Sequence, residues 1–204
     1  MRYLLVVLWL GVVWNREAKN TLTDWETCRT SKGVELQYRW VNLGDTLTTR
    51  EMRAIFTIQA KAEDILLNFD QPQKLSQWVA GSRNCSVYRL NNNNWIIHTL
   101  LDIPKPLTQK DMLIQYALSY SDDSIVLNMK PVPQYLPSVE GIVRMQNYEG
   151  YWLLKPLGDG STNVEFYSTS FTRPVLPRFI QDPVIQRILI RSFKSLTHLA
   201  ESSS

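Results

Sequence analysis

The 204-residue chain is 44% hydrophobic and 20% charged, which predicts one globular domain with a substantial core. Its 22 basic and 19 acidic residues give a formal charge of +3, too small a surplus for a typical nucleic-acid-binding protein. Seven Trp, nine Tyr and six Phe supply apolar area that suits either a thick core or a lined pocket.

The N-terminal segment resembles a secretory signal peptide. Arg2 precedes an apolar run over residues 3–14 that is too short to cross a bilayer, which needs about 20 residues. Arg16 is a poor match to a cleavage site, because a small residue is preferred there. We expect 1–20 to be a signal-peptide-like segment, 21–204 to form the domain, and the protein to be exported to the periplasm or secreted. The alternative is a cytoplasmic protein with a buried N-terminal element.

The first predicted elements are a short helix and two strands. Residues 22–33 are predicted to be helical, because Thr23 or Asp24 can cap the first turn. Residues 34–41 and 51–60 alternate apolar and polar side chains, which is typical of half-buried strands. The side chains expected on one face of these strands are Val34, Leu36, Tyr38, Trp40, Ala54, Phe56 and Ile58.

The middle of the chain switches from helical to strand periodicity. Residues 61–79 have helical spacing, and Pro72 divides them into two short helices. After Gly81, short turns separate segments rich in β-formers, which predicts an antiparallel meander. The predicted strands are 84–90, 95–103, 111–120, 124–130, 140–155 and 163–171. Prolines exclude the linkers 104–110 and 131–140 from central pairing.

Alternation groups the side chains of these strands by face without deciding which face lines a cavity. Strand 111–120 carries Met112, Ile114, Tyr116 and Leu118 on a single face. Strand 95–103 presents inward either Ile96, His98 and Leu100 or Trp95, Ile97 and Leu101. Both sets are largely apolar, so this choice stays open.

The chain ends in a long amphipathic helix. Asp182 is predicted to cap it and Pro183 to occupy its first position, and the helix should run for about eighteen residues. Its apolar stripe comprises Val184, Ile185, Ile188, Leu189, Phe193, Leu196 and Leu199. Its polar, basic side comprises Gln186, Arg187, Arg191, Lys194 and His198.

The element order predicts an α+β fold. A curved antiparallel β-sheet should wrap around the long C-terminal helix, with short N-terminal and inserted helices, because both layers carry apolar faces that must meet. We expect a monomer.

The chain resembles the START lipid-transfer domain of the helix-grip superfamily, in its bacterial, single-domain exported form. The matching stretches are "W…GVELQYRW" (25–40), "WV" (78–79), "IPKPLTQKD" (103–111), "VRMQNYEGYWLLKPLGDGSTNVEFY" (143–167) and "RPVLPRFIQDPVIQRILIRSF" (173–193). The resemblance covers about 25–200 and is most specific over 143–193. It implies a tunnel between sheet and C-terminal helix that holds one hydrophobic molecule, with the helix and nearby loops acting as a lid.

The resemblance also implies where the tunnel opens. Residues 104–110 correspond to a loop at its mouth, and 173–180 lead into the lid helix. Basic residues cluster around both, namely Lys105, Arg173, Arg178, Arg187, Arg191 and Lys194. They would favour contact with an anionic membrane surface, and the alternative is a solvated helix face.

Several residues are candidate ligand contacts. The resemblance implies that Arg144 orients a ligand head group; the alternative is pairing with a carboxylate on the outer face, for which Glu165 is the candidate. Glu165 is otherwise a solvated strand residue. His98 either orients a ligand hydroxyl or carboxylate or is an ordinary core or surface histidine. The remaining candidates are Tyr116, Tyr148, Trp152, Tyr167, Ile185, Leu189 and Phe193.

Motifs for other chemistry are missing from the sequence. Cys28 and Cys85 can form one disulfide if the protein is exported, and the alternative is two unpaired cysteines. No Cys-x-x-Cys or His-x-x-x-His spacing predicts a metal site. No Ser-His-Asp order, Gly-rich phosphate loop or paired carboxylates stand out, so we predict neither catalytic residues nor a cofactor.

Three functions are compatible with these observations. The first is binding of a lipid or other hydrophobic molecule in the tunnel, together with transfer of that molecule between membranes. We expect no nucleic-acid partner. The second is a helix-grip enzyme, similar to a cyclase or hydrolase, with acid–base groups in the same cavity. The third is a scaffold whose own side chains fill the cavity, which a volume below about 300 Å³ would favour.

Overall fold

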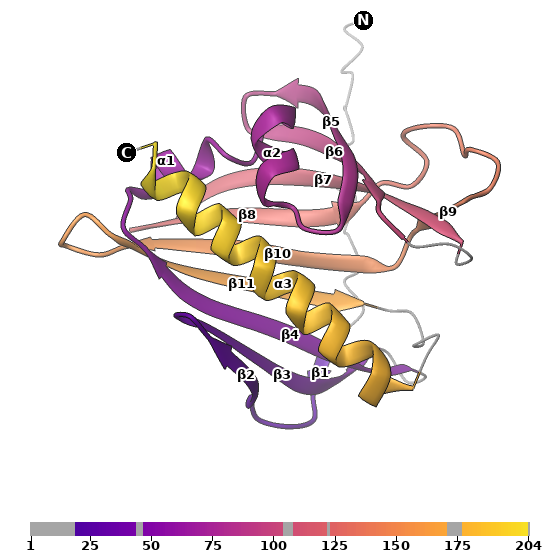
Figure 1. The fold of residues 1–204 in the computed structure, drawn as a ribbon, viewed down its shortest axis with the longest axis horizontal. Helices are drawn as coiled ribbons and strands as arrows, with labels where there is room; N and C mark the ends of the chain where they lie inside the picture. The colour runs from indigo at the N-terminus through magenta and orange to yellow at the C-terminus, as the bar shows by residue number, and fades with distance from the viewer. Residues whose placement is uncertain (1–18, 44–46, 104–107, 122, 171–176, 204) are drawn as a thin grey trace, which may run out of the picture.

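The structure is a computed structural model, and it describes residues 19–43, 47–103, 108–121, 123–170 and 177–203. The described residues form two layers. Within these ranges an 11-stranded sheet forms one layer, and the long helix α3 (Arg178–Glu201) crosses its concave face (Figure 1). The shorter helices α1 (Ala62–Leu66) and α2 (Pro72–Trp78) lie on the same side. None of the described helices is long and apolar enough to cross a membrane.

The sheet is antiparallel along its main path. The strands are β1 (Lys19–Thr21), β2 (Glu26–Ser31), β3 (Val34–Leu43), β4 (Leu47–Ile58), β5 (Ser82–Asn91), β6 (Asn94–Leu101), β7 (Gln109–Ser121), β8 (Ser124–Pro131), β9 (Ile142–Met145), β10 (Tyr148–Pro156) and β11 (Thr162–Ser170). Their order is β1-β3-β4-β11-β10-β8-β7-β6-β5, and β2 pairs with β3. The predicted α+β class and the meander from β5 onward are confirmed.

The predicted helix over 22–33 is wrong, because this segment contains β2, which forms a hairpin with β3. Its chain reverses at Lys32 and Gly33, which both have positive φ, the conformation that a two-residue hairpin turn requires. Thr23, the expected cap, instead accepts a hydrogen bond from the Trp40 backbone N–H (3.0 Å). Pairing with β3 therefore overrides the local capping signal.

Two other boundaries differ from the predictions. The predicted strand 140–155 is two strands, and the first of them, β9, pairs in parallel with β7. Helix α3 begins at Arg178 rather than after Asp182, and Pro183 lies inside it. The Pro177 carbonyl accepts hydrogen bonds from the backbone N–H groups of Ile180 and Gln181, so the first turn of the helix closes before Pro183 is reached.

The inner face of the sheet holds the main core. Ala54, Phe56 and Ile58 are buried on β4, as the alternation predicted. Phe193 of α3 stacks on Phe56, with ring centroids 5.1 Å apart. It also contacts two other aromatic rings, those of Trp152 at 5.6 Å and Phe166 at 5.3 Å. This aromatic cluster joins the C-terminal half of α3 to the sheet.

Gly150 on β10 provides a test of this close packing. A Cβ there would lie 2.1 Å from the Tyr167 carbonyl oxygen and 2.9 Å from a Met129 side-chain carbon. We expect Gly150→Ala to lower the free energy of unfolding by about 3 kcal/mol, measured by urea denaturation, because backbone must move to relieve the clash. The control Gly158→Ala, whose Cβ would meet nothing within 4 Å, should be neutral or stabilise by up to about 1 kcal/mol. Equal effects of both changes would contradict this packing.

Candidate functional site

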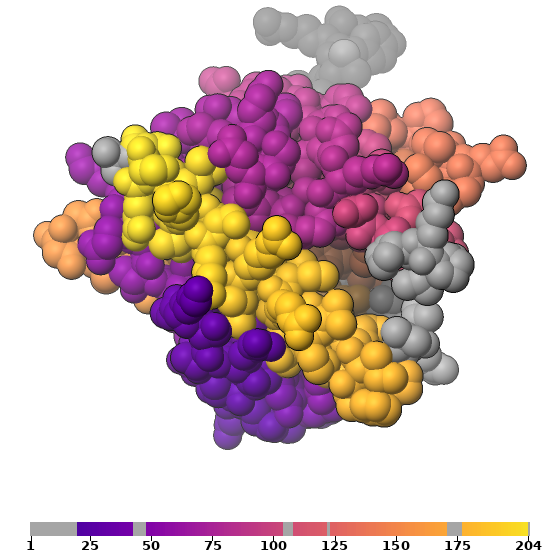
Figure 2. Space-filling model, viewed as in Figure 1, coloured from indigo at the N-terminus to yellow at the C-terminus, as the bar shows by residue number. Residues whose placement is uncertain are grey.

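A cavity with two adjoining chambers lies between the sheet and α3. The outer chamber has a volume of about 420 Å³ and the inner chamber of about 200 Å³. Leu101, Tyr148 and Leu189 line both chambers, so the two meet at these side chains. Figure 2 shows a hollow beside the N-terminal half of α3, where the outer chamber is lined by helix residues.

The inner chamber is almost entirely apolar. It ends against the aromatic cluster, and its lining includes Trp78, Ile97, Ile114, Met129, Trp152 and Phe193. Few polar side chains face it, among them Thr99 and Tyr116. A hydrocarbon group would therefore find matching apolar surface here, at about 25 cal/mol per Å² buried.

The outer chamber combines apolar and polar walls. Its apolar side chains are Met52, Leu101, Ile103, Met145, Ile185 and Leu189. Its polar and charged side chains include Tyr38, Thr49, Arg50, Lys110, Ser168 and Asp182. A molecule with an apolar body and one polar end would fit this gradient, with its polar end outward.

An ion pair closes one side of the outer chamber. Arg50 on β4 pairs with Asp182 on α3 and so links the sheet to the start of the helix. The Arg50 guanidinium lies over the rings of Tyr38 (4.2 Å) and Trp40 (4.7 Å). Its Nε is buried and makes no hydrogen bond within the described residues, which leaves one donor available at the chamber wall.

Two half-buried tyrosines that line the cavity contribute neutral hydroxyls. Burial raises the pKa of Tyr148 to about 12, although a hydrogen bond with Ser168 acts in the opposite direction. Burial also raises the pKa of Tyr116. Both side chains therefore stay protonated at neutral pH and can donate or accept a hydrogen bond from an uncharged ligand group.

The structure places six of the ten candidate ligand residues at the cavity: Tyr116, Tyr148, Trp152, Ile185, Leu189 and Phe193. In β6 the inward residues are Ile97, Thr99 and Leu101, which resolves the choice that alternation left open. Sequence reasoning missed the chamber residues on β4 and β11, such as Met52 and Ser168. Their places in alternating strands are a usable signal, because they share faces with Phe56 and Phe166.

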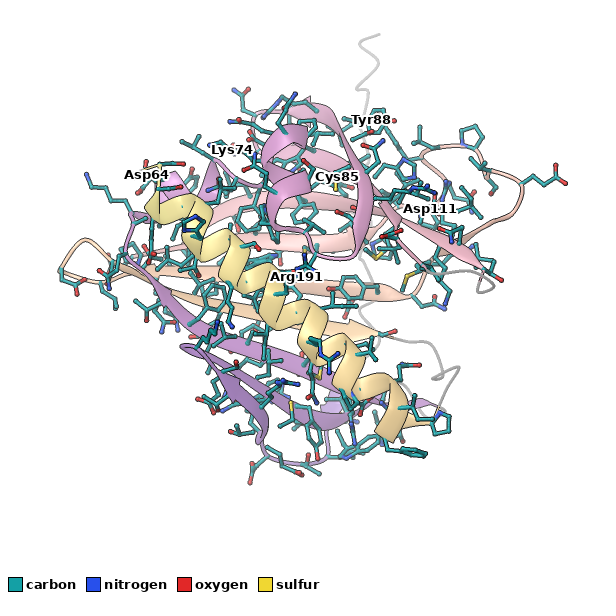
Figure 3. The ribbon with its side chains drawn as sticks, in the orientation of Figure 1. Asp64, Lys74, Cys85, Tyr88, Asp111 and Arg191 are labelled. Carbon is teal, nitrogen blue, oxygen red and sulfur yellow. The ribbon has the colours of Figure 1, made fainter. Side chains whose placement is uncertain are left out.

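Arg144 and His98, by contrast, lie on the outer face of the sheet. Asp111 on β7 accepts hydrogen bonds from Arg144 Nη2 (2.7 Å) and lies 2.9 Å from His98 Nε2 (Figure 3 labels Asp111). Arg144 also donates to the carbonyls of Pro133, Leu136 and Pro137. Its guanidinium is thus saturated by protein groups and holds β9 and the preceding loop against β7. The prediction that these two side chains orient a ligand is corrected accordingly.

Glu165 and Tyr167 also point away from the cavity. Glu165 accepts hydrogen bonds from Lys155 Nζ (2.9 Å) and the Tyr167 hydroxyl (2.6 Å). Tyr167 stacks on Tyr151, with centroids 4.4 Å apart. The inner face of β11 is formed by the intervening residues, such as Phe166, so period-two alternation places Glu165 and Tyr167 outside. The carboxylate that pairs with Arg144 is Asp111 and not Glu165.

The structure also bears on the two cysteines and on metal binding, whereas some residues named in the sequence analysis lie outside the described ranges. Cys28 and Cys85 are unpaired, so the disulfide alternative is wrong. Burial raises the pKa of both thiols. The described ranges contain no group of three or more His, Cys, Asp or Glu side chains arranged to hold a metal ion. Lys105, Arg173 and nearly all of the segment 1–20 lie outside the described residues.

Comparison with known proteins identifies the fold. The STAR-related lipid transfer protein of Xanthomonas axonopodis superposes with a TM-score of 0.75 at 21% identity, covering 86% of this chain and 98% of that one. Human StAR-related lipid transfer protein 5 gives a TM-score of 0.69 at 18% identity, covering 87% and 86%. The chain has the START-like helix-grip fold.

A structural neighbour with a lower TM-score is similar in fold over most of its length. The Zhui aromatase/cyclase from Streptomyces sp. R1128 has a TM-score of 0.54 at 12% identity, covering 75% of this chain and 94% of that chain. By sequence, the chain is 22% identical over 183 residues to the uncharacterized protein PA1579 of Pseudomonas aeruginosa, covering 87% of each. No protein-family profile matches the chain.

The buried Arg144–Asp111 pair can be tested against an exposed pair on the same START-like sheet. Asp111→Asn should lower the free energy of unfolding by about 3 kcal/mol at pH 7, because Arg144 would remain charged and buried without a counter-charge. Lys155→Gln, which breaks the more exposed Lys155–Glu165 pair, should cost less than about 1 kcal/mol in the same urea titrations.

The pH dependence provides a second readout of this change. Burial alone would raise the pKa of Asp111, but hydrogen bonds and charge from Arg144 and His98 hold it below the usual value. The wild type should therefore lose stability as the pH falls from about 4 through this lower pKa, and Asp111→Asn should lack that step. An equal cost of Asp111→Asn and Lys155→Gln at pH 7 would contradict the assigned role.

Proposed function

We propose that this protein binds a lipid or another hydrophobic small molecule in the two-chamber cavity. The observation that carries the proposal is the apolar inner chamber, which adjoins an outer chamber with both apolar and polar walls. The outer volume of about 420 Å³ exceeds the limit of about 300 Å³ that would favour a self-filled scaffold. The START-related lipid transfer proteins of the same fold support this ligand class.

Binding without catalysis fits the described cavity better than the enzyme alternative. General acid–base chemistry needs a positioned titratable group near the reacting atoms. His98 points away from the cavity and His198 is exposed on α3. Asp182, the carboxylate in the outer chamber, is paired with Arg50. The aromatase/cyclase neighbour keeps an enzyme as the second candidate for this fold.

We also propose that the protein transfers its bound ligand between membranes. The first turns of α3, beside the outer chamber, expose Phe179 (80%), Ile180 (46%) and Val184 (52%). Apolar side chains gathered at a cavity entrance suit insertion into a bilayer surface, and Arg178 and Lys110 nearby would favour anionic lipids. We propose that an exported monomer docks through this end of α3 and exchanges its ligand there.

Blocking the junction of the chambers tests the binding function. Leu189→Trp should fill the space where the chambers meet and lower the bound fraction at least tenfold, measured by native mass spectrometry after incubation with a lipid extract. Leu90→Trp, the matched control at an exposed position on β5, should bind as the wild type does. If folded Leu189→Trp protein retained the same bound mass as the control, the cavity would not be the binding site.

The Arg50–Asp182 pair tests exchange at the start of α3. Asp182→Asn should speed the release of a fluorescent lipid to acceptor vesicles about two- to fivefold, because a partly exposed ion pair contributes up to about 1 kcal/mol. Asp70→Asn breaks another Arg–Asp pair, with Arg89, that does not border the cavity. The rate of this control should match the wild type; equal acceleration in both variants would argue against gating by α3.

A further inference from the structure

A second hollow lies on the other side of α3, separate from the ligand cavity. This basic groove has a volume of about 280 Å³ and lies between β2 and the helix. Its lining comprises Arg29, Ser31, Arg187, Ile190, Arg191, Lys194 and Ser195. Lys32, at the tip of the β2–β3 hairpin, shares the adjoining hollow with Lys194. Figure 2 shows this hairpin lying against α3, and Figure 3 labels Arg191 on the helix.

The charges of the basic groove are not balanced by acidic side chains. In the ranges that the structure describes, no ion pair joins the four cations of the groove or the neighbouring Lys32 to a carboxylate, whereas Arg39, Arg50, Arg89, Arg144 and Lys155 all have such partners. Glu201 is a carboxylate of the adjoining hollow and not of the groove, and its Oε1 accepts a hydrogen bond from the Gln59 backbone N–H (3.0 Å). The groove is therefore a concentrated positive region on a chain whose formal charge is only +3.

Two further observations show that this arrangement has a cost. Partial burial lowers the pKa of Lys194, and so do the nearby positive charges of Lys32 and Arg29. Lys32 is also the non-glycine residue with a positive φ (51°) within the described ranges, a conformation that Asn or Gly adopts more easily. Like charges held this close repel one another unless an anion lies between them.

We propose that the basic groove binds a phosphate-bearing anion with at least two negative charges. Arg29, Arg187 and Arg191 offer planar guanidinium groups, which bind phosphate oxygens through paired hydrogen bonds. The recessed shape suits a compact phosphate group that enters between hairpin and helix. Such an anion would relieve the repulsion among the cations and hold the hairpin against α3. This site is independent of the ligand cavity.

The test compares two charge-neutralising double variants. Arg187→Gln/Arg191→Gln removes two cations of the basic groove, both on exposed positions of α3. Lys61→Gln/Arg83→Gln removes the same charge from exposed positions elsewhere. Binding of pyrophosphate is measured by isothermal titration calorimetry at fixed salt, and binding to phosphatidylcholine vesicles with and without phosphatidate is measured by flotation.

A tenfold or greater loss of pyrophosphate affinity in the groove variant, with less than a twofold change in the control, supports a site for a soluble phosphate compound. Groove-dependent flotation with phosphatidate vesicles, without pyrophosphate binding, supports a site for a lipid headgroup. The proposal is overturned if the wild type binds neither pyrophosphate nor phosphatidate vesicles. It is also overturned if both variants lose binding equally, or if the groove variant loses none.

Thermal unfolding without ligand checks that the groove variant folds and tests the repulsion itself. The groove variant should unfold about 2 °C higher than the wild type, because two like charges are removed from a crowded site. Pyrophosphate should raise the unfolding temperature of the wild type and of the control but not of the groove variant. A groove variant that unfolds at or below the wild-type temperature would overturn the inferred repulsion.

Discussion

The aromatic contacts of Phe193 determine where α3 packs against the sheet. They thereby also determine where a space remains between the two layers. Phe193 is 1% exposed and packs among Phe56, Trp152 and Phe166 on the concave face. Two turns earlier on the same helix, Ile185 is 40% exposed. A helix fixed at one end to a curved surface diverges from that surface at the other end. The cavity is the space left by this divergence, and the remaining interactions define its walls.

Polar interactions then hold the walls in place without filling the space. The buried Arg144–Asp111 pair fixes β9 to the outer face of β7, and the Arg50–Asp182 pair fixes the start of α3 to β4. The first pair is almost fully buried and the second is partly exposed, so the second is the weaker of the two. The weaker pair therefore lies at the end of α3 that borders the outer chamber.

Much of the fold could be predicted from local periodicity, because one-sided burial imposes a period of two on strands such as β3, β4 and β7. Periodicity failed where burial is two-sided: Ile96 and Ile97 are both buried. On the outer face, Tyr135 from the loop after β8 packs on Tyr88, the cross-strand neighbour of Ile96. It also failed for Arg144, because its partner lies 33 residues away on a strand that pairs in parallel. Such partners depend on topology, which no local window of sequence contains.

The central claim is that the space between the sheet and the N-terminal half of α3 accepts an apolar guest. The most direct measurement is a crystal structure of the protein grown with a long-chain fatty acid brominated along its chain, with bromine located by anomalous scattering. The account predicts bromine peaks in the inner chamber beside Trp152 and Leu189. Bromine found only on the protein surface, with the chambers closed by the protein's own side chains, would contradict it.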